Sequence, residues 1–266
     1  MEFGKKLANN QLNLKGFENT FDNIKKGTMK RLIITLCLVL VANLSYGAEQ
    51  PDYSIWERLL QANVSRSGKV DYNKFKIKQD TLDAFLQELK DHGPNKEWKK
   101  SEKKAYYMNA YNAYTIKFVI RRYPVESVKD VKFSGKDIWN TKLVFLGDKT
   151  YTLSQVENDI LRKMGDPRIH FGINCASISC PKLYNHAFTS SNVNSALTKL
   201  TKAYINDENH NIIKPKKLQL SEIFKWYMVD FTEDQTLIEW LNKYSEVTID
   251  PAAKITYLEY NWSIND

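Results

Sequence analysis

Residues 170–181 contain most of the side chains in this sequence that could carry out chemistry. The segment reads His-Phe-Gly-Ile-Asn-Cys-Ala-Ser-Ile-Ser-Cys-Pro, so it holds one histidine and two cysteines. A cysteine acts as a nucleophile when a base, usually histidine, lies within hydrogen-bond reach. Cys175 and Cys180 are therefore candidate nucleophiles, and His170 is the candidate base.

The expected backbone of this segment limits which pairs can meet. Residues 168–175 predict a strand that enters a loop. Side chains alternate between the two faces of a strand, so His170 shares a face with Asn174 while Cys175 points to the other. His170 could then reach Cys180 if the loop folds back, but it could serve Cys175 only through a bulge. His186 could approach either thiol.

A disulfide is the alternative interpretation of the two cysteines. Export to an oxidising compartment, which we expect from the N-terminal sequence, favours a bond between Cys175 and Cys180. The closed loop would be short, so its entropic contribution would be small and the bond could be redox-labile. The spacing of the cysteines and histidines does not match the usual zinc motifs, so no metal is expected.

A second group of candidate residues lies on a long helix expected over residues 101–123, with Ser101 as its cap and Pro124 after its end. Asn109 and Asn112 are three residues apart and share a face. Because asparagine is a poor helix-interior residue, the pair predicts hydrogen bonds to a neighbouring loop or a ligand. A stripe of aromatic residues at helical spacing on the same helix is typical of core packing. The candidate binding residues are Asn109, Asn112, Tyr114, Ser177 and Ser179.

The remaining patterns predict the elements that must position these side chains. Amphipathic helices are expected at residues 53–64 and 80–92, a hairpin at 142–153, and a helix from a capping box at 154–157 to about residue 164. Further on, we expect a helix at 190–206, a hairpin around 214–216, helices at 221–231 and 233–244, and a strand at 254–262. Helices dominate and strands cluster in hairpins. The class is therefore α+β, a single helix-rich domain with a small antiparallel or mixed sheet built from hairpins.

Residues 29–47 have the three parts of a secretory signal peptide. Met29-Lys30-Arg31 is basic, residues 32–44 are almost wholly apolar, and small residues precede an expected cleavage between Gly47 and Ala48. The apolar run is shorter than the roughly 20 residues that a membrane-spanning helix needs. We therefore expect a periplasmic or secreted mature chain without a transmembrane segment.

The division of the chain follows from this signal. Residues 1–28 are interpreted as a spurious upstream extension or a long n-region, and residues 48–266 as one domain, since no linker or repeat divides them. Removing the first 47 residues takes away seven Lys/Arg and three Asp/Glu, so the formal charge falls from +8 to +4. This charge is mild and spread along the chain, which argues against a nucleic-acid partner.

Several short motifs, in this order, resemble the DUF547 family. They are Asn109-Ala-Tyr-Asn112-Ala, Tyr123-Pro-Val-Glu-Ser127, Asp166-Pro-Arg-Ile-His-Phe171, Cys175-Ala-Ser177 with Ser179-Cys180-Pro181, and Tyr260-Asn-Trp-Ser263. The resemblance spans residues 53–263 and implies an exported bacterial domain of unknown function. Within it, Cys175 is the thiol that best matches the motif. His186 departs from the family pattern, in which an acidic residue is more usual.

Three functions agree with the sequence. The favoured one is a small-molecule or peptide binding domain whose pocket is lined by the histidine and cysteines. The second is a thiol-dependent hydrolase or transferase that uses Cys175 or Cys180 with His170, and the third is a cell-envelope scaffold. No complete triad or phosphate-binding loop is visible, so we name no reaction and expect no cofactor.

Overall fold

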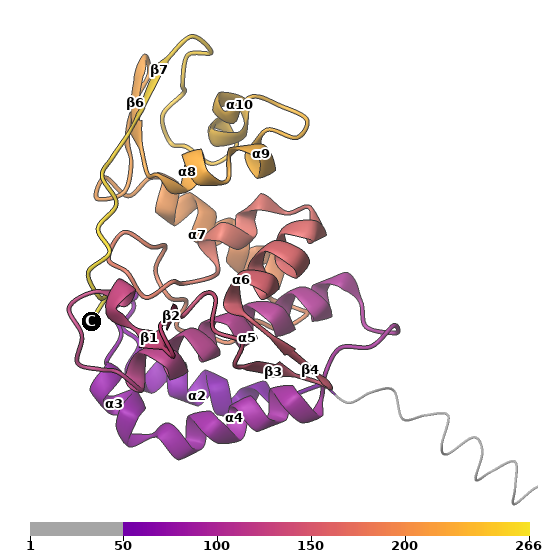
Figure 1. Cartoon of the computed structure of the whole chain (residues 1–266). Helices are drawn as coiled ribbons and strands as arrows, with labels where there is room; N and C mark the ends of the chain where they lie inside the picture. The colour runs from indigo at the N-terminus through magenta and orange to yellow at the C-terminus, as the bar shows by residue number, and fades with distance from the viewer. Residues whose placement is uncertain (1–49) are drawn as a thin grey trace, which may run out of the picture. The chain divides into compact units, whose positions relative to one another are not determined.

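The helix that carries the asparagine motif lies at the centre of the fold (Figure 1). In the computed structural model, which describes residues 50–266, this helix is α5 (Lys100–Ile120), and 16 of its 21 residues are buried. A helix that is buried nearly all round must be covered on every side by other elements. The expected signal peptide and the extension before it lie outside the described residues.

The start of α5 differs from the prediction. Ser101 does not cap the helix, because its hydroxyl lies 2.8 Å from the Ser190 hydroxyl. The carboxylate of Glu102 instead accepts a hydrogen bond from the backbone N–H of Lys99 at 2.6 Å. The helix therefore begins one residue earlier than expected.

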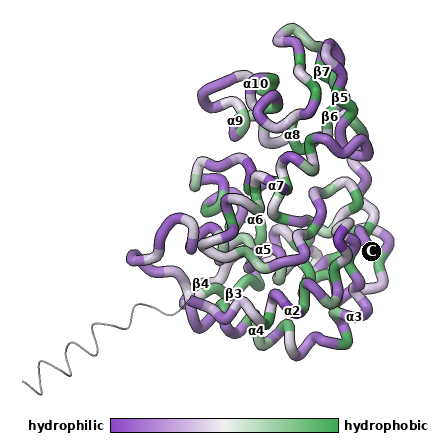
Figure 2. Tube along the Cα trace, turned by 180° about the vertical axis from the view of Figure 1, so that it is seen from behind, coloured by the Kyte–Doolittle hydropathy of each residue, from purple (hydrophilic) through white to green (hydrophobic). Residues whose placement is uncertain are grey.

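Three helices from the N-terminal part of the described chain pack together around one side of α5. They are α2 (Tyr53–Asn63), α3 (Tyr72–Ile77) and α4 (Gln79–Asp91). Asp52 caps α2 by accepting a hydrogen bond from Ser54 N–H, and Asp71 caps α3 by accepting one from Lys74 N–H. The helices predicted at 53–64 and 80–92 are confirmed, whereas α3 was not predicted. Along the tube in Figure 2, hydrophobic and hydrophilic residues alternate within these helices, as amphipathic helices require.

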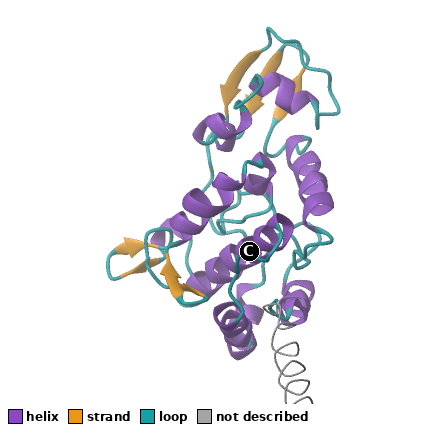
Figure 3. Cartoon of the chain, turned by 90° about the vertical axis from the view of Figure 1, so that its right-hand side faces the viewer, coloured by secondary structure: helices purple, strands orange, loops and turns teal. Residues whose placement is uncertain are grey.

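The strands form small, separate sheets (Figure 3). A short 3₁₀ turn, η1 (Val128–Asp130), precedes the first of them. The strands are β1 (Lys132–Phe133) with β2 (Lys136–Asp137), β3 (Val144–Leu146) with β4 (Lys149–Tyr151), and β5 (Ile212–Lys214), β6 (Lys217–Leu220) and β7 (Lys254–Tyr257). The two predicted hairpins are confirmed as β3–β4 and β5–β6, and β7 adds to β6 in parallel. The class is α+β, as predicted.

The opposite side of α5 is covered by a run of helical turns and by α7 (Val193–Ile205). The turns are α6 (Leu153–Gln155), the π-helical η2 (Val156–Leu161) and the 3₁₀ turn η3 (Arg162–Met164). The predicted capping box at 154–157 is wrong by two residues, because Thr152 and Gln155 form it through reciprocal hydrogen bonds of 3.0 Å. Glu157 therefore does not cap this helix, and its side chain is buried.

The strand predicted at residues 168–175 is wrong. Residues Pro167–Phe171 form a 3₁₀ helix, η4, which Asp166 caps by accepting a hydrogen bond from Arg168 N–H at 3.2 Å. Proline is pre-organised for the first position of a helical turn, so the Asp-Pro pair starts a helix here. His170 and Cys175 therefore do not point to opposite faces of a strand, as the prediction had required.

The C-terminal part adds three short helices and a returning tail. The helices are α8 (Ile223–Trp226), α9 (Met228–Phe231) and α10 (Leu237–Asn242). After β7 the chain runs back to the N-terminal helices, where it ends (Figure 1). Its backbone bonds to the cysteine segment, from Ile178 N–H to Ser263 C=O at 2.8 Å and from Asn265 N–H to Ala176 C=O at 3.2 Å.

Residues 50–266 form one compact unit. Within them, no helix is long and apolar enough to span a bilayer.

Candidate functional site

A cavity of about 230 Å³ lies beside Cys175, between the cysteine segment, η2 and the C-terminal tail. Its walls are largely aromatic: Tyr111, Trp139, Trp226, Tyr227, Tyr260 and Trp262. Cys175, Cys180, Glu157 and His170 also line the cavity. It thus combines an apolar enclosure with a few polar groups, as small-ligand sites do.

A larger cavity of about 620 Å³ lies on the other side of the cysteine segment, against α7 and the end of the chain. Cys180 and Ser177 contribute to it, but Cys175 does not. We place the candidate site in the smaller cavity, because that one includes the cysteine whose surroundings favour a thiolate.

The sulfur of Cys175 lies within hydrogen-bond distance of two hydroxyl groups. It lies 3.2 Å from the Ser177 hydroxyl and 3.3 Å from the Tyr260 hydroxyl, and the Cys180 thiol is close enough to bond to it. The hydrogen bond from Cys180, together with those from Ser177 and Tyr260, outweighs the effect of burial and lowers the pKa of Cys175 to about 7. The surroundings of Cys175 therefore favour its thiolate form.

Cys180 has the opposite character. Burial, followed by the proximity of Cys175, raises the pKa of Cys180 well above its usual value. Its sulfur accepts a hydrogen bond from the backbone N–H of Cys175 at 2.9 Å. Both cysteines are free thiols, and they are not at disulfide distance. The structure therefore describes a dithiol in which Cys180 is the neutral, supporting member.

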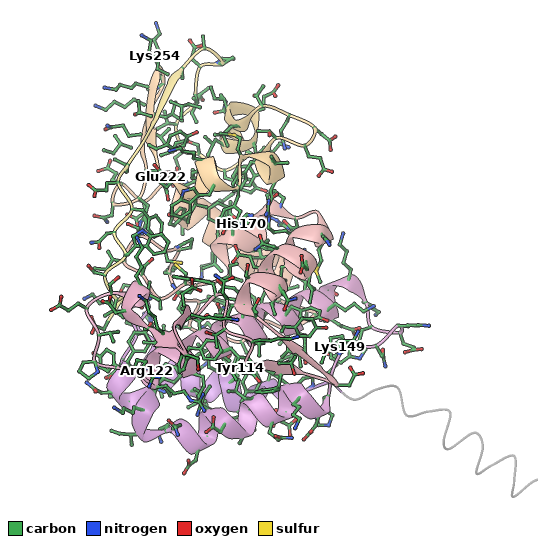
Figure 4. All side chains as sticks on the ribbon, in the orientation of Figure 1. Tyr114, Arg122, Lys149, His170, Glu222 and Lys254 are labelled. Carbon is green, nitrogen blue, oxygen red and sulfur yellow. The ribbon has the colours of Figure 1, made fainter. Side chains whose placement is uncertain are left out.

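His170 belongs to the cavity wall but is held by other groups. Its Nε2 lies 2.7 Å from Asp230 Oδ2, and its ring stacks on Tyr227 with 3.9 Å between centroids. Burial disfavours the charge of Asp230, but hydrogen bonds from His170 and Arg162 outweigh it and hold the pKa of that carboxyl well below its usual range. Among the contacts of the described residues, none joins the imidazole to the sulfur of Cys175. Figure 4 shows His170 in the body of the fold, near the C-terminal helices.

Glu157 projects from η2 into the cavity wall, where it is 6% exposed. Its Oε1 accepts a hydrogen bond from the Tyr227 hydroxyl at 2.5 Å, and its Oε2 accepts one from the Tyr111 hydroxyl at 3.2 Å. Burial, reinforced by the Glu157 carboxyl, raises the pKa of both tyrosines well above their usual value, so both stay protonated and donate.

The two asparagines of α5 hold the loops around the site. Asn112 donates to Gly172 C=O at 3.0 Å and accepts from Asn174 N–H at 2.9 Å. Asn109 makes the same two-pronged contact with the backbone of Phe188, at 2.7 and 2.9 Å. The expectation that these residues bond to a neighbouring loop is confirmed. Their place in a ligand site remains a prediction.

The other predicted residues are divided between the site and its surroundings. Ser177 lies at the site, since it bonds to Cys175 and to the Tyr260 hydroxyl at 3.1 Å. Ser179 does not line the cavity, and its hydroxyl accepts a hydrogen bond from Asn261 N–H at 2.9 Å. Tyr114 lies away from His170 in Figure 4 and bonds to the backbone of Phe145. His186 pairs with Glu57 at 2.7 Å and does not line the cavity.

Several residues of the cavity and its surroundings have no functional signal in the sequence. The predicted capping box gives Glu157 a structural role, and the helix predicted at 221–231 contains Tyr227 and Asp230 without a functional role. Trp139 and Trp226 gave no local signal, because their neighbours in space are distant in sequence. The closing Tyr-Asn-Trp-Ser motif was noted, and it supplies two walls of the cavity, Tyr260 and Trp262.

The fold and the cavity together define an α+β domain that presents a thiol inside an aromatic enclosure. Residues 95–205 match the family model described as "Protein of unknown function, DUF547". This match supports the resemblance to DUF547 that the motifs indicate. It covers residues 95–205, whereas the resemblance of the motifs spans residues 53–263. No curated protein and no solved structure matches the chain. Among the described residues, no group of three or more His, Cys, Asp or Glu side chains could hold a metal ion.

Proposed function

We propose that this protein binds a small molecule, or one side chain of a peptide, in the cavity beside Cys175. The observation that carries the proposal is the enclosure of about 230 Å³, with aromatic walls and a small set of polar groups that includes Glu157, His170 and Cys175. Ligand sites typically have this composition, and those for drug-sized molecules measure about 300–1,000 Å³. The smaller volume favours a compact ligand.

Tryptophan fluorescence of the full chain tests this proposal. Trp139, Trp226 and Trp262 line the cavity, so a ligand that enters it changes their emission. We expect a saturable change with at least one member of a library of small metabolites and amino-acid derivatives. Trp262→Ala should weaken that response, whereas Ile77→Ala, at a position 83% exposed on α3, should not. A library without any saturable response would refute the proposal.

A second function, thiol-dependent hydrolysis or group transfer by Cys175, is favoured by the position of its sulfur beside the cavity and within hydrogen-bond distance of the Ser177 and Tyr260 hydroxyls. The pKa of Cys175 is lowered to about 7, so the thiolate forms at neutral pH without a base in contact with the sulfur. Cys180 is not the nucleophile in this proposal, because burial raises the pKa of its thiol.

Alkylation of the native chain tests the second function. Iodoacetamide should modify Cys175 with a rate that rises through pH 7, as followed by mass spectrometry of the peptide that contains it. Cys175→Ser should remove this fast phase. Cys180→Ala should keep it but shift its midpoint to higher pH, because one donor to the sulfur is removed. Labelling of Cys175 only after denaturation would exclude the nucleophile.

We also propose that the chain is an exported bacterial protein, cleaved between Gly47 and Ala48. The basic, apolar and small-residue parts of residues 29–47 support this proposal. Expression of the full chain in a Gram-negative host, followed by fractionation and N-terminal sequencing, should give a periplasmic product that begins at Ala48. A cytoplasmic product that retains residues 29–47 would contradict it.

A further inference from the structure

The cavity contains a buried carboxyl group, Glu157, that forms no ion pair with any Lys, Arg or His of the described residues. Glu157 accepts hydrogen bonds from the hydroxyls of Tyr111 and Tyr227, both of which are neutral donors. Buried charges in proteins are usually paired, because desolvation of an unpaired charge is costly.

The nearest candidate partner is already used by another carboxylate. Arg162 follows Glu157 on the same helical run, and its guanidinium lies 5.2 Å from the centre of the Tyr227 ring. However, its Nε and Nη2 both donate to Asp230, at 2.7 Å each. Two parallel hydrogen bonds of this kind hold the guanidinium in place. Arg162 is thus close enough to act on Glu157 through its charge, but the direct hydrogen bonds of Glu157 come from two tyrosine hydroxyls.

The aromatic walls have the chemistry of a cation site. Trp226, Tyr260 and Trp262 form one cluster, with 4.5 to 5.7 Å between ring centroids. The face of an aromatic ring is negative and attracts ammonium groups, and cages of such rings bind quaternary ammonium ligands. One ring of the cluster already contacts an alkylammonium group, because the Nζ of Lys129 lies 4.5 Å from the centre of the Trp262 ring. Trp226 is 45% exposed, so it stands at an open part of the wall.

The other groups of the cavity disfavour an anion. Arg162 and Lys129 lie against the Tyr227 and Trp262 rings but do not line the cavity. Among the lining residues only His170 can carry a positive charge, and its Nε2 faces Asp230. Cys175 adds negative charge when its thiol ionises. An anionic ligand would therefore meet repulsion from two sides, whereas a cation would be attracted by the carboxylate, the thiolate and the ring faces.

We propose that the cavity selects an organic cation, a quaternary or protonated amine of about the size of an amino-acid side chain, through the Glu157 carboxylate and the surrounding ring faces. This inference rests on the proposed binding function and names its ligand class. The cation would enter beside Trp226, place its charge over the rings and neutralise Glu157. The Cys175 sulfur would then lie next to the bound molecule.

A matched pair of probes tests the inference on the full chain. The cationic probes are choline, tetramethylammonium and butylammonium. The neutral probe is the carbon isostere of choline, in which a tert-butyl group replaces the trimethylammonium group. By tryptophan fluorescence and calorimetry, we expect at least one cation to bind, and choline to bind about tenfold or more tightly than its isostere.

Two variants assign the preference to the named groups. Glu157→Gln should weaken choline binding about tenfold and leave the isostere unchanged, whereas Glu97→Gln, an exposed change of the same charge, should affect neither. Trp226→Leu, an apolar change at a half-exposed position, should also reduce choline binding more than isostere binding. This second variant keeps the test open if Glu157→Gln does not fold.

The outcomes separate this inference from the function on which it rests. Equal binding of choline and its isostere, or saturable binding only of neutral or anionic library members, would overturn the cation preference and leave the binding function standing. A preference for choline that neither Glu157→Gln nor Trp226→Leu reduces would also overturn the assignment to this cavity. The absence of any saturable ligand would refute both proposals.

Discussion

The two sulfur atoms of the cysteine segment have different surroundings, although their residues are only five positions apart. Two hydroxyls and a thiol lie within hydrogen-bond reach of the Cys175 sulfur, and Cys180 is enclosed and neutral. The hydroxyl of Tyr260 comes from the returning tail, so the ionisation of Cys175 depends on a residue 85 positions away. A cysteine of low pKa is commonly assigned a histidine partner, but here neutral donors are the direct contacts of the sulfur.

Removing one of these donors should raise the pKa of Cys175. Tyr260→Phe keeps the ring and deletes the hydroxyl, so the midpoint of iodoacetamide labelling should rise above pH 7 by roughly one unit, as expected for one hydrogen bond to a charged group. The measurement is the labelling rate of Cys175 as a function of pH. Tyr257→Phe, the same change on β7, should leave the midpoint in place. An unchanged midpoint in Tyr260→Phe would show that the tyrosine hydroxyl does not stabilise the thiolate.

At the scale of elements, the short helix η4 depends on its cap, Asp166. This carboxylate bonds to Lys104 Nζ at 2.5 Å and to Arg168 Nε at 2.8 Å. Burial raises the pKa of Asp166, but the hydrogen bonds from Arg168 and Lys104 outweigh it and lower that pKa to about 2. A carboxyl with a depressed pKa stabilises the fold above its usual value, near 4, and this contribution is lost as the pH falls through about 2.

Asp166→Asn should therefore destabilise the protein in a pH-dependent way. At pH 7 the free energy of unfolding should fall by roughly 3 kcal/mol, because Lys104 is left buried without its partner. The difference from the unmodified chain should shrink as the pH falls from about 4 to 2. Urea unfolding across this range measures it, with the exposed change Asp234→Asn as control. A difference that stays constant with pH would contradict the role of the Asp166 charge.

The asparagines of α5 give a second prediction at this scale. Asn112→Ala leaves Gly172 C=O and Asn174 N–H buried without partners, so we expect a loss of about 3 kcal/mol in unfolding free energy. Asn73→Ala, the same change at an exposed position on α3, should alter stability by less than about 0.5 kcal/mol. Urea unfolding compares the two variants. Equal effects would show that the two hydrogen bonds of Asn112 contribute nothing beyond those of a surface residue.

The elements predicted correctly are those with strong local signals. Amphipathic periodicity identified α2 and α4, and the Gly147-Asp148 turn identified the β3–β4 hairpin. The strand predicted after Asp166 is wrong because Asp166-Pro167 starts a short helix there. The asparagine pair was recognised because its residue type conflicts with a helix interior. The ring cluster and Glu157 could not be found in the same way, since only the folded chain brings them together.

At the scale of the whole described unit, the cavity is assembled from segments on both sides of the boundary of the family match. Trp139, Glu157 and Cys175 lie within residues 95–205, whereas Trp226, Tyr260 and Trp262 lie beyond them. The tail that carries the last two residues pairs with the backbone of the cysteine segment. The matched segment therefore contains the thiol but only part of its surroundings.

This division predicts that residues 95–205 do not form the site, or a stable fold, on their own. Without α2 and α4, one face of α5 would expose large buried side chains such as Tyr106 and Phe118 to water, and that apolar area drives folding. We expect the segment to lack a cooperative urea transition by circular dichroism, whereas the full chain shows one. Without the Tyr260 hydroxyl, labelling of Cys175 in the segment should follow the pKa of an ordinary cysteine, about 8.5. A cooperative transition with a labelling midpoint that stays near pH 7 would show that the matched segment is self-sufficient and that the tail only covers it.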